Sequence, residues 1–240
     1  MATASWFDAN VPWDFLLIFF VFAVIVPWRG WARMQRLQAL LTVSGRERLR
    51  LYATSIGSQW ILAGFIAWRA LARGVSFSEL GLKFTPLAEL IAAGLVGSAF
   101  LGLVHWANLV RVARSQNPAL EPIRKVARAI FPHTDREAAI FCGLAITAGV
   151  CEEFLYRGFV FAALSRLLLP TWIVLSISSV LFGLAHAYQG RKGMVGTLLL
   201  GTVFGCFRIL YDSLVPLVFW HTAVDLVAGF AGRRYLVENK

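Results

Sequence analysis

The sequence predicts an all-α fold, a polytopic bundle of about seven (seven to eight) helices that cross a membrane. Of the 240 residues, 58% are hydrophobic and only 15% are charged, too few to cover the surface of an ordinary soluble domain. The apolar residues fall into runs of about the 20 residues that a helix needs to cross the hydrocarbon core. Tryptophans near the ends of these runs suit the headgroup level, namely Trp13, Trp28, Trp106 and Trp172.

Seven apolar runs are separated by charged or turn-forming segments. The fourth run is longer than one perpendicular crossing and has polar residues near its middle. Short breaks at Pro170, at 188–193 (YQGRKG) and at 212–216 predict that the last four helices are antiparallel neighbours around one core. The predicted spans are 13–28, 51–68, 87–109, 137–169, 171–187, 193–211 and 214–231.

Lys and Arg are distributed unevenly between the two sides of the predicted bundle. Seventeen of the 23 fall in the first, third and fifth connections and at the C-terminus, and about five fall on the other side. The positive-inside rule therefore places the N-terminus outside and the C-terminus in the cytoplasm, and a bacterial inner membrane is the expected location. Asp8 and Asp14 stand where a signal peptide would be basic, so we expect the first helix to be retained.

The net charge is +10, and we expect the basic segments to bind the headgroups of membrane lipids. The basic residues show no nucleic-acid recognition pattern, so no nucleic acid is expected. The basic connections 29–50 and 111–136 also contain apolar residues, among them Leu37, Leu40 and Leu41, so an amphipathic helix can lie on the membrane there. The three cysteines lie in apolar runs without a CxxC spacing, which indicates neither a disulfide framework nor a thiolate metal site.

Ionisable residues inside the spans cost about 2.5 to 3.5 kcal/mol each on insertion scales, so those that persist need a partner and usually have a purpose. They cluster in the last four spans. The fourth span holds Glu152, Glu153 and Arg157 (CEEFLYRG), the fifth ends at His186 (FGLAH), and the seventh holds His221 and Asp225 (HTAVD).

The spacing of the first cluster separates two adjacent carboxylates. Glu153 and Arg157 stand at i and i+4, in the favourable order for an ion pair. Glu152 points about 100° away on the helix, which leaves it free to act as a general base. A buried packing network of all three charges is the alternative interpretation.

The histidines complete a possible hydrolytic site. Either one alone is weak evidence, but His221 and Asp225 again stand at i and i+4 on one face. Two imidazoles and two carboxylates from three adjacent helices can position a water molecule, or hold a Zn²⁺ ion. The metal ligands would then be Glu152, His186, His221 and Asp225.

Other polar residues have simpler interpretations. Arg208 and Asp212 stand at i and i+4 near a helix end and are expected to pair. Glu89 lies in the first turn of its helix, where the macrodipole favours a carboxylate. No GxSxG motif is present, so a serine nucleophile is not expected.

Taken together, the motifs resemble those of a known protease family. Glu152, Glu153 and Arg157 match its EExxxR motif, Phe182 and His186 its FxxxH, and His221 and Asp225 its HxxxN/D. This is the CPBP family of CAAX proteases and bacteriocin-processing enzymes, also called ABI, which includes the type II CAAX prenyl endopeptidases. The resemblance covers roughly 137–231, and SELGL at 78–82 is similar to a connection often seen before the family's core.

The resemblance implies a role for each motif. Glu152 would activate water and His186 would help to hold it, while Glu153 and Arg157 would shape the site. His221 with Asp225 would stabilise the oxyanion or bind metal. Asp225 stands where the CAAX-cleaving members typically have Asn, and an ionised carboxylate has no hydrogen to donate to an oxyanion.

The chain is therefore predicted to be an intramembrane endopeptidase that hydrolyses a peptide bond in a membrane-associated protein. A lipidated, CAAX-like C-terminus is one candidate substrate. Whether a divalent metal is required stays open, with metal-free chemistry favoured. A membrane transporter or proton relay, and a non-catalytic membrane scaffold, are the rival interpretations. Residues 1–240 are expected to form a single membrane domain, in which 1–136 hold the N-terminal helices and 137–231 the catalytic core.

The two halves of the predicted site differ in depth. At about 1.5 Å per residue, Glu152 lies roughly 22 Å from the cytoplasmic end of its helix. His186, in contrast, ends its helix near that side. A tilt, or a water-filled cavity open to the cytoplasm, is needed to bring the two residues together.

Overall fold

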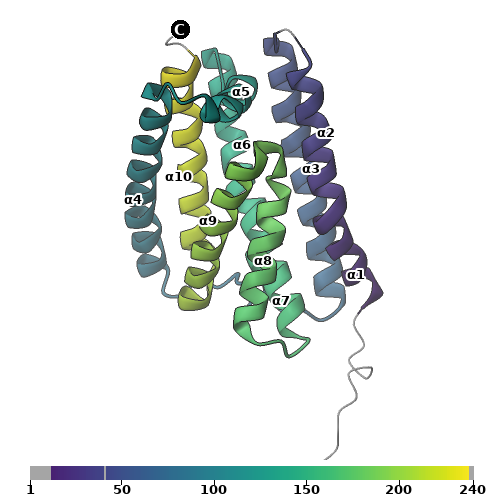
Figure 1. Ribbon diagram of the computed structural model, residues 1–240. Coiled ribbons are helices and arrows are strands. Elements are labelled where there is room, and N and C mark those ends of the chain that lie inside the picture. The colour runs from purple at the N-terminus through teal and green to yellow at the C-terminus, as the bar shows by residue number, and fades with distance from the viewer. Residues whose placement is uncertain (1–11, 41, 238–240) are drawn as a thin grey trace, which may run out of the picture.

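The computed structural model describes residues 12–40 and 42–237, and the described part contains helices and no strand (Figure 1). The predicted all-α class is thus confirmed. Asp8, Leu41 and both chain ends lie outside the described residues. The expectations about a signal peptide and about the sides on which the termini lie therefore involve residues that are not described.

The helices follow the predicted spans closely. Three π-helical segments, η1, η3 and η5, continue neighbouring α-helices without a break. In chain order the elements are α1 (Trp13–Phe20), η1 (Val21–Ile25), α2 (Val26–Gln38), α3 (Gly45–Ala72), α4 (Leu87–Arg114), η2 (Pro118–Leu120), α5 (Glu121–Ile130), α6 (Asp135–Glu153), η3 (Phe154–Phe159), α7 (Val160–Ser165), α8 (Thr171–Ala185), η4 (Ala187–Gln189), α9 (Gly190–Tyr211), α10 (Val215–Gly232) and η5 (Arg233–Val237).

Among the described residues, five helical segments are long and apolar enough to cross a membrane, namely Trp13–Gln38, Leu87–Arg114, Asp135–Ser165, Ala187–Tyr211 and Val215–Val237. The two other predicted spans correspond to α3, which has 28 residues but is less apolar, and to α8, which is apolar but has 15 residues. Large apolar side chains such as Leu16, Ile61 and Val96 are exposed on the outside of the bundle. An outer surface of this kind suits lipid as the solvent, as expected for an integral membrane protein.

The basic connections differ in part from the prediction. The first helix does not end near residue 28 but continues to Gln38, so 29–38 form no separate helix on a membrane surface. Basic side chains need not end a spanning helix, because their stems lie along apolar surface while their charged heads reach the interface. In the second connection a short amphipathic helix is present as α5, and it lies across the upper end of the bundle in Figure 1.

Helix α6 is the centre of the packing. Helix α10 packs between α4 and α6, α3 packs on the other side of α6, and α8 packs on α9 (Figure 1). Gly149 of α6 permits the close approach of α10, because a Cβ atom there would lie 2.2 Å from Thr222 Oγ1. The fourth predicted span is one continuous helical segment, Asp135–Ser165, in which the π-helical turn η3 joins α6 to α7.

The short hairpin of α8 and α9 resolves the difference in depth. In Figure 1 the turn between these helices lies below the upper ends of α2, α3 and α10. His186 is the C-cap of α8, so it lies at this turn, below the upper end of the bundle in Figure 1. The 15-residue length of α8 thus brings His186 to the level of the polar cluster on α6.

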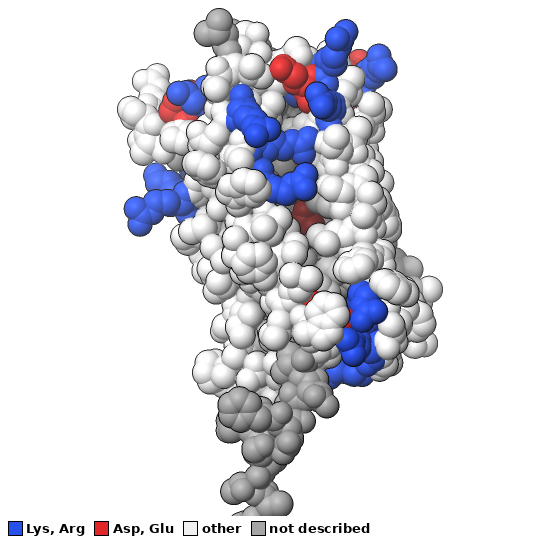
Figure 2. All heavy atoms as spheres, turned by 90° about the vertical axis from the view of Figure 1, so that its right-hand side faces the viewer, with Lys and Arg blue, Asp and Glu red and all other residues white. Residues whose placement is uncertain are grey.

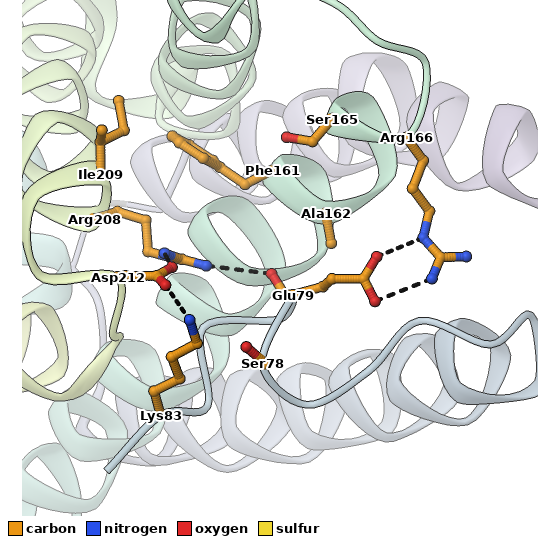
Figure 3. Close-up of a pocket in the computed structure, with 10 residues that line it drawn as sticks. All are labelled: Ser78, Glu79, Lys83, Phe161, Ala162, Ser165, Arg166, Arg208, Ile209 and Asp212. Carbon is orange, nitrogen blue, oxygen red and sulfur yellow. Dashed lines mark hydrogen bonds and ion pairs between the residues drawn. The ribbon is translucent and has the colours of Figure 1, made fainter. Parts of the chain in front are cut away.

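A set of ion pairs, here called the polar clasp, ties the connection 73–86 to the ends of α7 and α9. Glu79 pairs with Arg166 at 2.8 Å, Arg208 with Asp212 at 2.7 Å, and Lys83 with Asp212. The predicted pair of Arg208 and Asp212 is thereby confirmed. These side chains line a cavity of about 440 Å³ to which no motif residue contributes (Figure 3). Because its charged groups pair with one another, we interpret this cavity as part of the clasp.

The clasp predicts a pH-dependent contribution to stability. The hydrogen bond from Arg166, supported by the backbone N–H of Ser76, lowers the pKa of Glu79 to about 2. A carboxyl whose pKa is lowered by folding stabilises the fold above its ordinary pKa of 4.5, and this contribution is lost as the pH falls toward 2. The Glu79 side chain is 38% exposed, which limits the contribution to at most about 1 kcal/mol at pH 7.

Thermal unfolding of Glu79→Gln in detergent should therefore show a small loss at pH 7 that shrinks between pH 4.5 and pH 2. Glu89→Gln, which changes an exposed carboxylate of α4, should leave stability unchanged at every pH. A difference between Glu79→Gln and the wild type that is the same at pH 7 and pH 2 would contradict the clasp.

Candidate active site

The site is built around Glu153, whose side chain is fully buried in the middle of the bundle. Its Oε1 accepts a hydrogen bond from Arg157 Nη1 at 3.1 Å and lies 2.7 Å from His221 Nδ1. The predicted ion pair between Glu153 and Arg157 is confirmed. One carboxylate oxygen therefore links the π-helical turn η3 to α10.

Arg157 is fully buried as well and lies among aromatic rings. Its Cζ atom lies 4.1 Å from the ring centroid of Phe182 and 5.7 Å from that of Phe204, which gives the cation two ring faces as neighbours. Gly201 of α9 leaves room for this arrangement, because a Cβ atom there would lie 2.9 Å from Arg157 Nη2. The π-helical turn carries this arginine, as π-bulges often carry functional residues.

Glu152, the preceding residue, has a different environment. Its Oε1 accepts a hydrogen bond of 2.8 Å from Gln59 Nε2 of α3. Its Oε2 has no hydrogen-bond partner within the described part of the chain. That oxygen lies 3.8 Å from His186 Nε2 and 4.0 Å from His221 Nε2. One oxygen of Glu152 is therefore fixed, and the other faces both imidazoles.

Hydrogen bonding at the Nδ1 atoms determines what the imidazoles present to Glu152. His186 Nδ1 lies 2.9 Å from the carbonyl oxygen of Phe182, which can only accept, so Nδ1 carries the hydrogen. The same reasoning applies to His221 Nδ1 beside the Glu153 carboxylate. In the neutral rings, both Nε2 atoms present a lone pair toward Glu152 Oε2.

Phe182 holds the two histidines at this distance. Its ring centroid lies 4.6 Å from that of His186 and 5.9 Å from that of His221. The same ring packs against Tyr156 on the other side, at 5.3 Å. Phe182 therefore supports the site by packing, in agreement with its place in the second motif.

Asp225 lies at the open side of the cluster. Its Oδ2 is 3.8 Å from His221 Nε2, and its side chain is 34% exposed. Glu152 and His186 are more enclosed, with side chains 17% and 14% exposed. The four predicted residues thus converge from three helices, as their spacing predicted.

The separations within this cluster fit a bound water molecule. A water oxygen can lie at hydrogen-bond distance, about 2.8 Å, from both Glu152 Oε2 and His186 Nε2, which are 3.8 Å apart. The same is true of Glu152 Oε2 and His221 Nε2, which are 4.0 Å apart. Ligand atoms of a tetrahedral Zn²⁺ ion would be roughly 3.3 Å apart for bonds of about 2.0 Å, so the side chains would have to move inward to hold zinc. Within residues 12–40 and 42–237, no group of three or more His, Cys, Asp or Glu is placed to hold a metal ion.

Sequence reasoning missed two residues of the site. Gln59 was a detectable signal, because it is a polar residue within the predicted span 51–68, but its partner lies 93 positions along the chain. Gly201 gave no signal, because glycine is common in membrane helices. Its role depends on the approach of α9 to Arg157.

Residues 134–227 match the family model for Type II CAAX prenyl endopeptidase Rce1-like proteins. This segment, which is less than half of the chain, is similar to the Rce1-like family. The match confirms the resemblance inferred from the three motifs and spans all the motif residues. No curated protein and no solved structure matches the chain. The similarity to this family supports a protease in general, and Glu152, His186, His221 and Asp225 are the residues through which that activity can be tested.

The buried pair predicts a large effect of removing Arg157. Arg157→Ala leaves the Glu153 carboxylate buried without its cation and should lower the free energy of unfolding by about 3 kcal/mol or more. Arg166→Ala, a matched control, removes an arginine that is 40% exposed and should cost at most about 1 kcal/mol. Thermal unfolding of both variants in detergent measures the difference. Equal, small losses would show that the Glu153 pair is not a structural requirement.

Proposed function

We propose that this protein is an intramembrane endopeptidase that uses Glu152 and His186 to activate water. Its substrates are membrane-associated proteins, with lipidated CAAX-like C-termini as the candidate class. The single observation that supports this most strongly is that Glu152 Oε2 is buried, lacks a partner within the described residues and faces two imidazole nitrogens at 3.8 and 4.0 Å.

In the proposed reaction a water molecule lies between Glu152 Oε2 and His186 Nε2. Glu152 takes one proton from this water, and the His186 lone pair accepts a hydrogen bond from the other hydrogen. The water oxygen then attacks the carbonyl carbon of the scissile bond. When the C–N bond breaks, Glu152 returns its proton to the leaving amine, so the enzyme is regenerated.

His221 is proposed to stabilise the negative charge that develops on the carbonyl oxygen. In the protonated ring, Nδ1–H donates to Glu153, and Nε2–H is left to donate to the oxyanion. Glu153 and Arg157 hold the imidazole in place and have no direct contact with the substrate in this mechanism. Their role is to position His221.

Metal-free hydrolysis is the proposed chemistry. Arg157 and His221 already neutralise Glu153, so the first motif needs no ion to account for its charges. A divalent ion bound by Glu152, His186, His221 and Asp225 would supply a Lewis acid for the carbonyl oxygen. The separation of these atoms favours water over zinc, and the experiment on Asp225 below distinguishes the two.

The first activity prediction concerns Glu152. Glu152→Gln keeps the size of the side chain and the bond to Gln59 but removes the base, so kcat should fall by about 10²- to 10⁴-fold with little change in thermal stability. The readout is cleavage of membrane-associated peptides, with new termini identified by mass spectrometry. Glu89→Gln, the same change on the surface of α4, should keep wild-type turnover. Wild-type turnover in a well-folded Glu152→Gln would rule out the proposed mechanism.

Asp225→Asn distinguishes metal-free from metal-dependent hydrolysis. If the helix supplies a hydrogen-bond donor to the oxyanion, Asn donates better than an ionised Asp, and the rate should be unchanged or higher. If Asp225 is a metal ligand, the change should weaken metal binding and activity together, and a chelator should inactivate the wild type. We expect the first result. Stoichiometric zinc that is lost together with activity in Asp225→Asn would contradict it.

The proposed topology places the C-terminus in the cytoplasm, because most basic residues lie on that side of the bundle. A C-terminal reporter that is active only in the cytoplasm should therefore be active, and a reporter that is active only outside should be silent. The opposite pattern would invert the topology and place the entrance of the site on the outer face.

A further inference from the structure

Helices α2 and α3 are separated by a seam that leads toward Glu152. Helix α2 packs mainly on η4, α8 and α5, whereas α3 packs on α6 and η3, so the two helices have little direct contact. Figure 2 shows the face on which they lie, with Lys and Arg side chains around a hollow and an acidic side chain inside it. The seam is therefore a lateral opening lined by positive charge.

Arg33 of α2 bridges the seam. Its guanidinium donates to Ser55 Oγ at 3.4 Å, to the carbonyl oxygen of Leu51 at 3.5 Å and to Thr54 Oγ1, all on α3. These partners are uncharged. Arg33 thus closes the seam at this level while its own charge is left without a carboxylate among the described residues.

Two further arginines add to this charge. Arg29 precedes Arg33 by one helical turn on α2. Arg50 lies on α3 next to Leu51, whose carbonyl oxygen accepts from Arg33. Neither forms an ion pair with any described carboxylate. Three like charges gathered at one opening are electrostatically unfavourable alone, and an anion bound among them would relieve the repulsion.

The helical register places this cluster directly above the candidate site. Arg33 binds Ser55, and Gln59, which holds Glu152, is the residue four positions later on the same face of α3. Four residues of helix correspond to about 6 Å. A group bound by Arg33 is therefore about one helical turn along α3 from the residue that holds Glu152.

We propose that Arg33, with Arg29 and Arg50, binds the C-terminal carboxylate of the substrate and so fixes which peptide bond reaches Glu152. The planar guanidinium fork matches a carboxylate. The Arg33 side chain spans the seam from α2 to α3. A substrate peptide that enters the seam below Arg33 therefore has its C-terminus at this side chain. This inference rests on the proposed function and adds a specificity subsite to it.

The test measures binding, so that it does not depend on turnover. Full-length Glu152→Gln protein in neutral phosphatidylcholine nanodiscs is titrated with a fluorescent farnesylated tetrapeptide, either as the free C-terminal acid or as the C-terminal amide. We expect the acid to bind about tenfold more tightly than the amide. Arg33→Gln should abolish this preference by weakening the acid alone. Arg29→Gln, which removes no hydrogen bond across the seam, should reduce the same preference.

Arg114→Gln is the matched control, because it removes an exposed arginine from α4 and should keep the full preference for the acid. Equal binding of the acid and the amide by the parent protein would overturn the carboxylate subsite. So would Arg33→Gln and Arg29→Gln variants that lose affinity for the acid and for the amide by the same factor. So would an arginine effect that appears only in nanodiscs with anionic phosphatidylglycerol and is the same for both peptides, because the cluster would then bind lipid headgroups. A preserved acid preference without cleavage by the wild type would instead refute the proposed function.

Discussion

The position of every other group in the site depends on one buried carboxylate. Glu153 is fully enclosed, and its Oε1 binds Arg157 on the π-helical turn and His221 on α10. An ionised carboxylate inside a membrane bundle is stable only when it is paired and hydrogen-bonded. Satisfying Glu153 therefore fixes the relative placement of η3 and α10, brings Arg157 onto the ring of Phe182, and orients His221 Nε2 toward the remaining carboxylates.

Two adjacent glutamates consequently have different environments. Glu153 is neutralised by its partners, whereas Glu152 is held through one oxygen by Gln59 and presents the other to the histidines. The short α8 is the second requirement, because it ends at the depth of this pair and delivers His186 there. The arginines at the seam between α2 and α3 add positive charge one helical turn above Gln59. In the proposed mechanism, Glu152 is the base, His186 helps to hold the water, and the arginines bind the anionic end of the peptide.

The sequence predicted the class of fold and much of the cluster because both depend on local spacing. Apolar runs identify spans, and i, i+4 spacing identifies the pair of Glu153 and Arg157 on one helix face. What it could not predict depends on contacts between distant segments. Gln59 and Glu152 are 93 positions apart, Gly201 matters only where α9 approaches Arg157, and the depth of His186 depends on where the hairpin of α8 and α9 ends. The sequence prediction also ended the first helix near residue 28, where basic residues begin, whereas the helix continues to Gln38.

The central claim is that Arg157 and His221, which lie on different helices, are coupled through the shared carboxylate of Glu153. A double-mutant cycle tests it most directly, with thermal unfolding of Arg157→Met, His221→Leu and the combined variant in the same detergent. Groups that share one buried partner are non-additive, so a coupling of about 1 kcal/mol or more is predicted, and it should vanish when the cycle is repeated with Glu153→Gln. Additive losses, or a coupling that persists without the Glu153 carboxylate, would contradict the account.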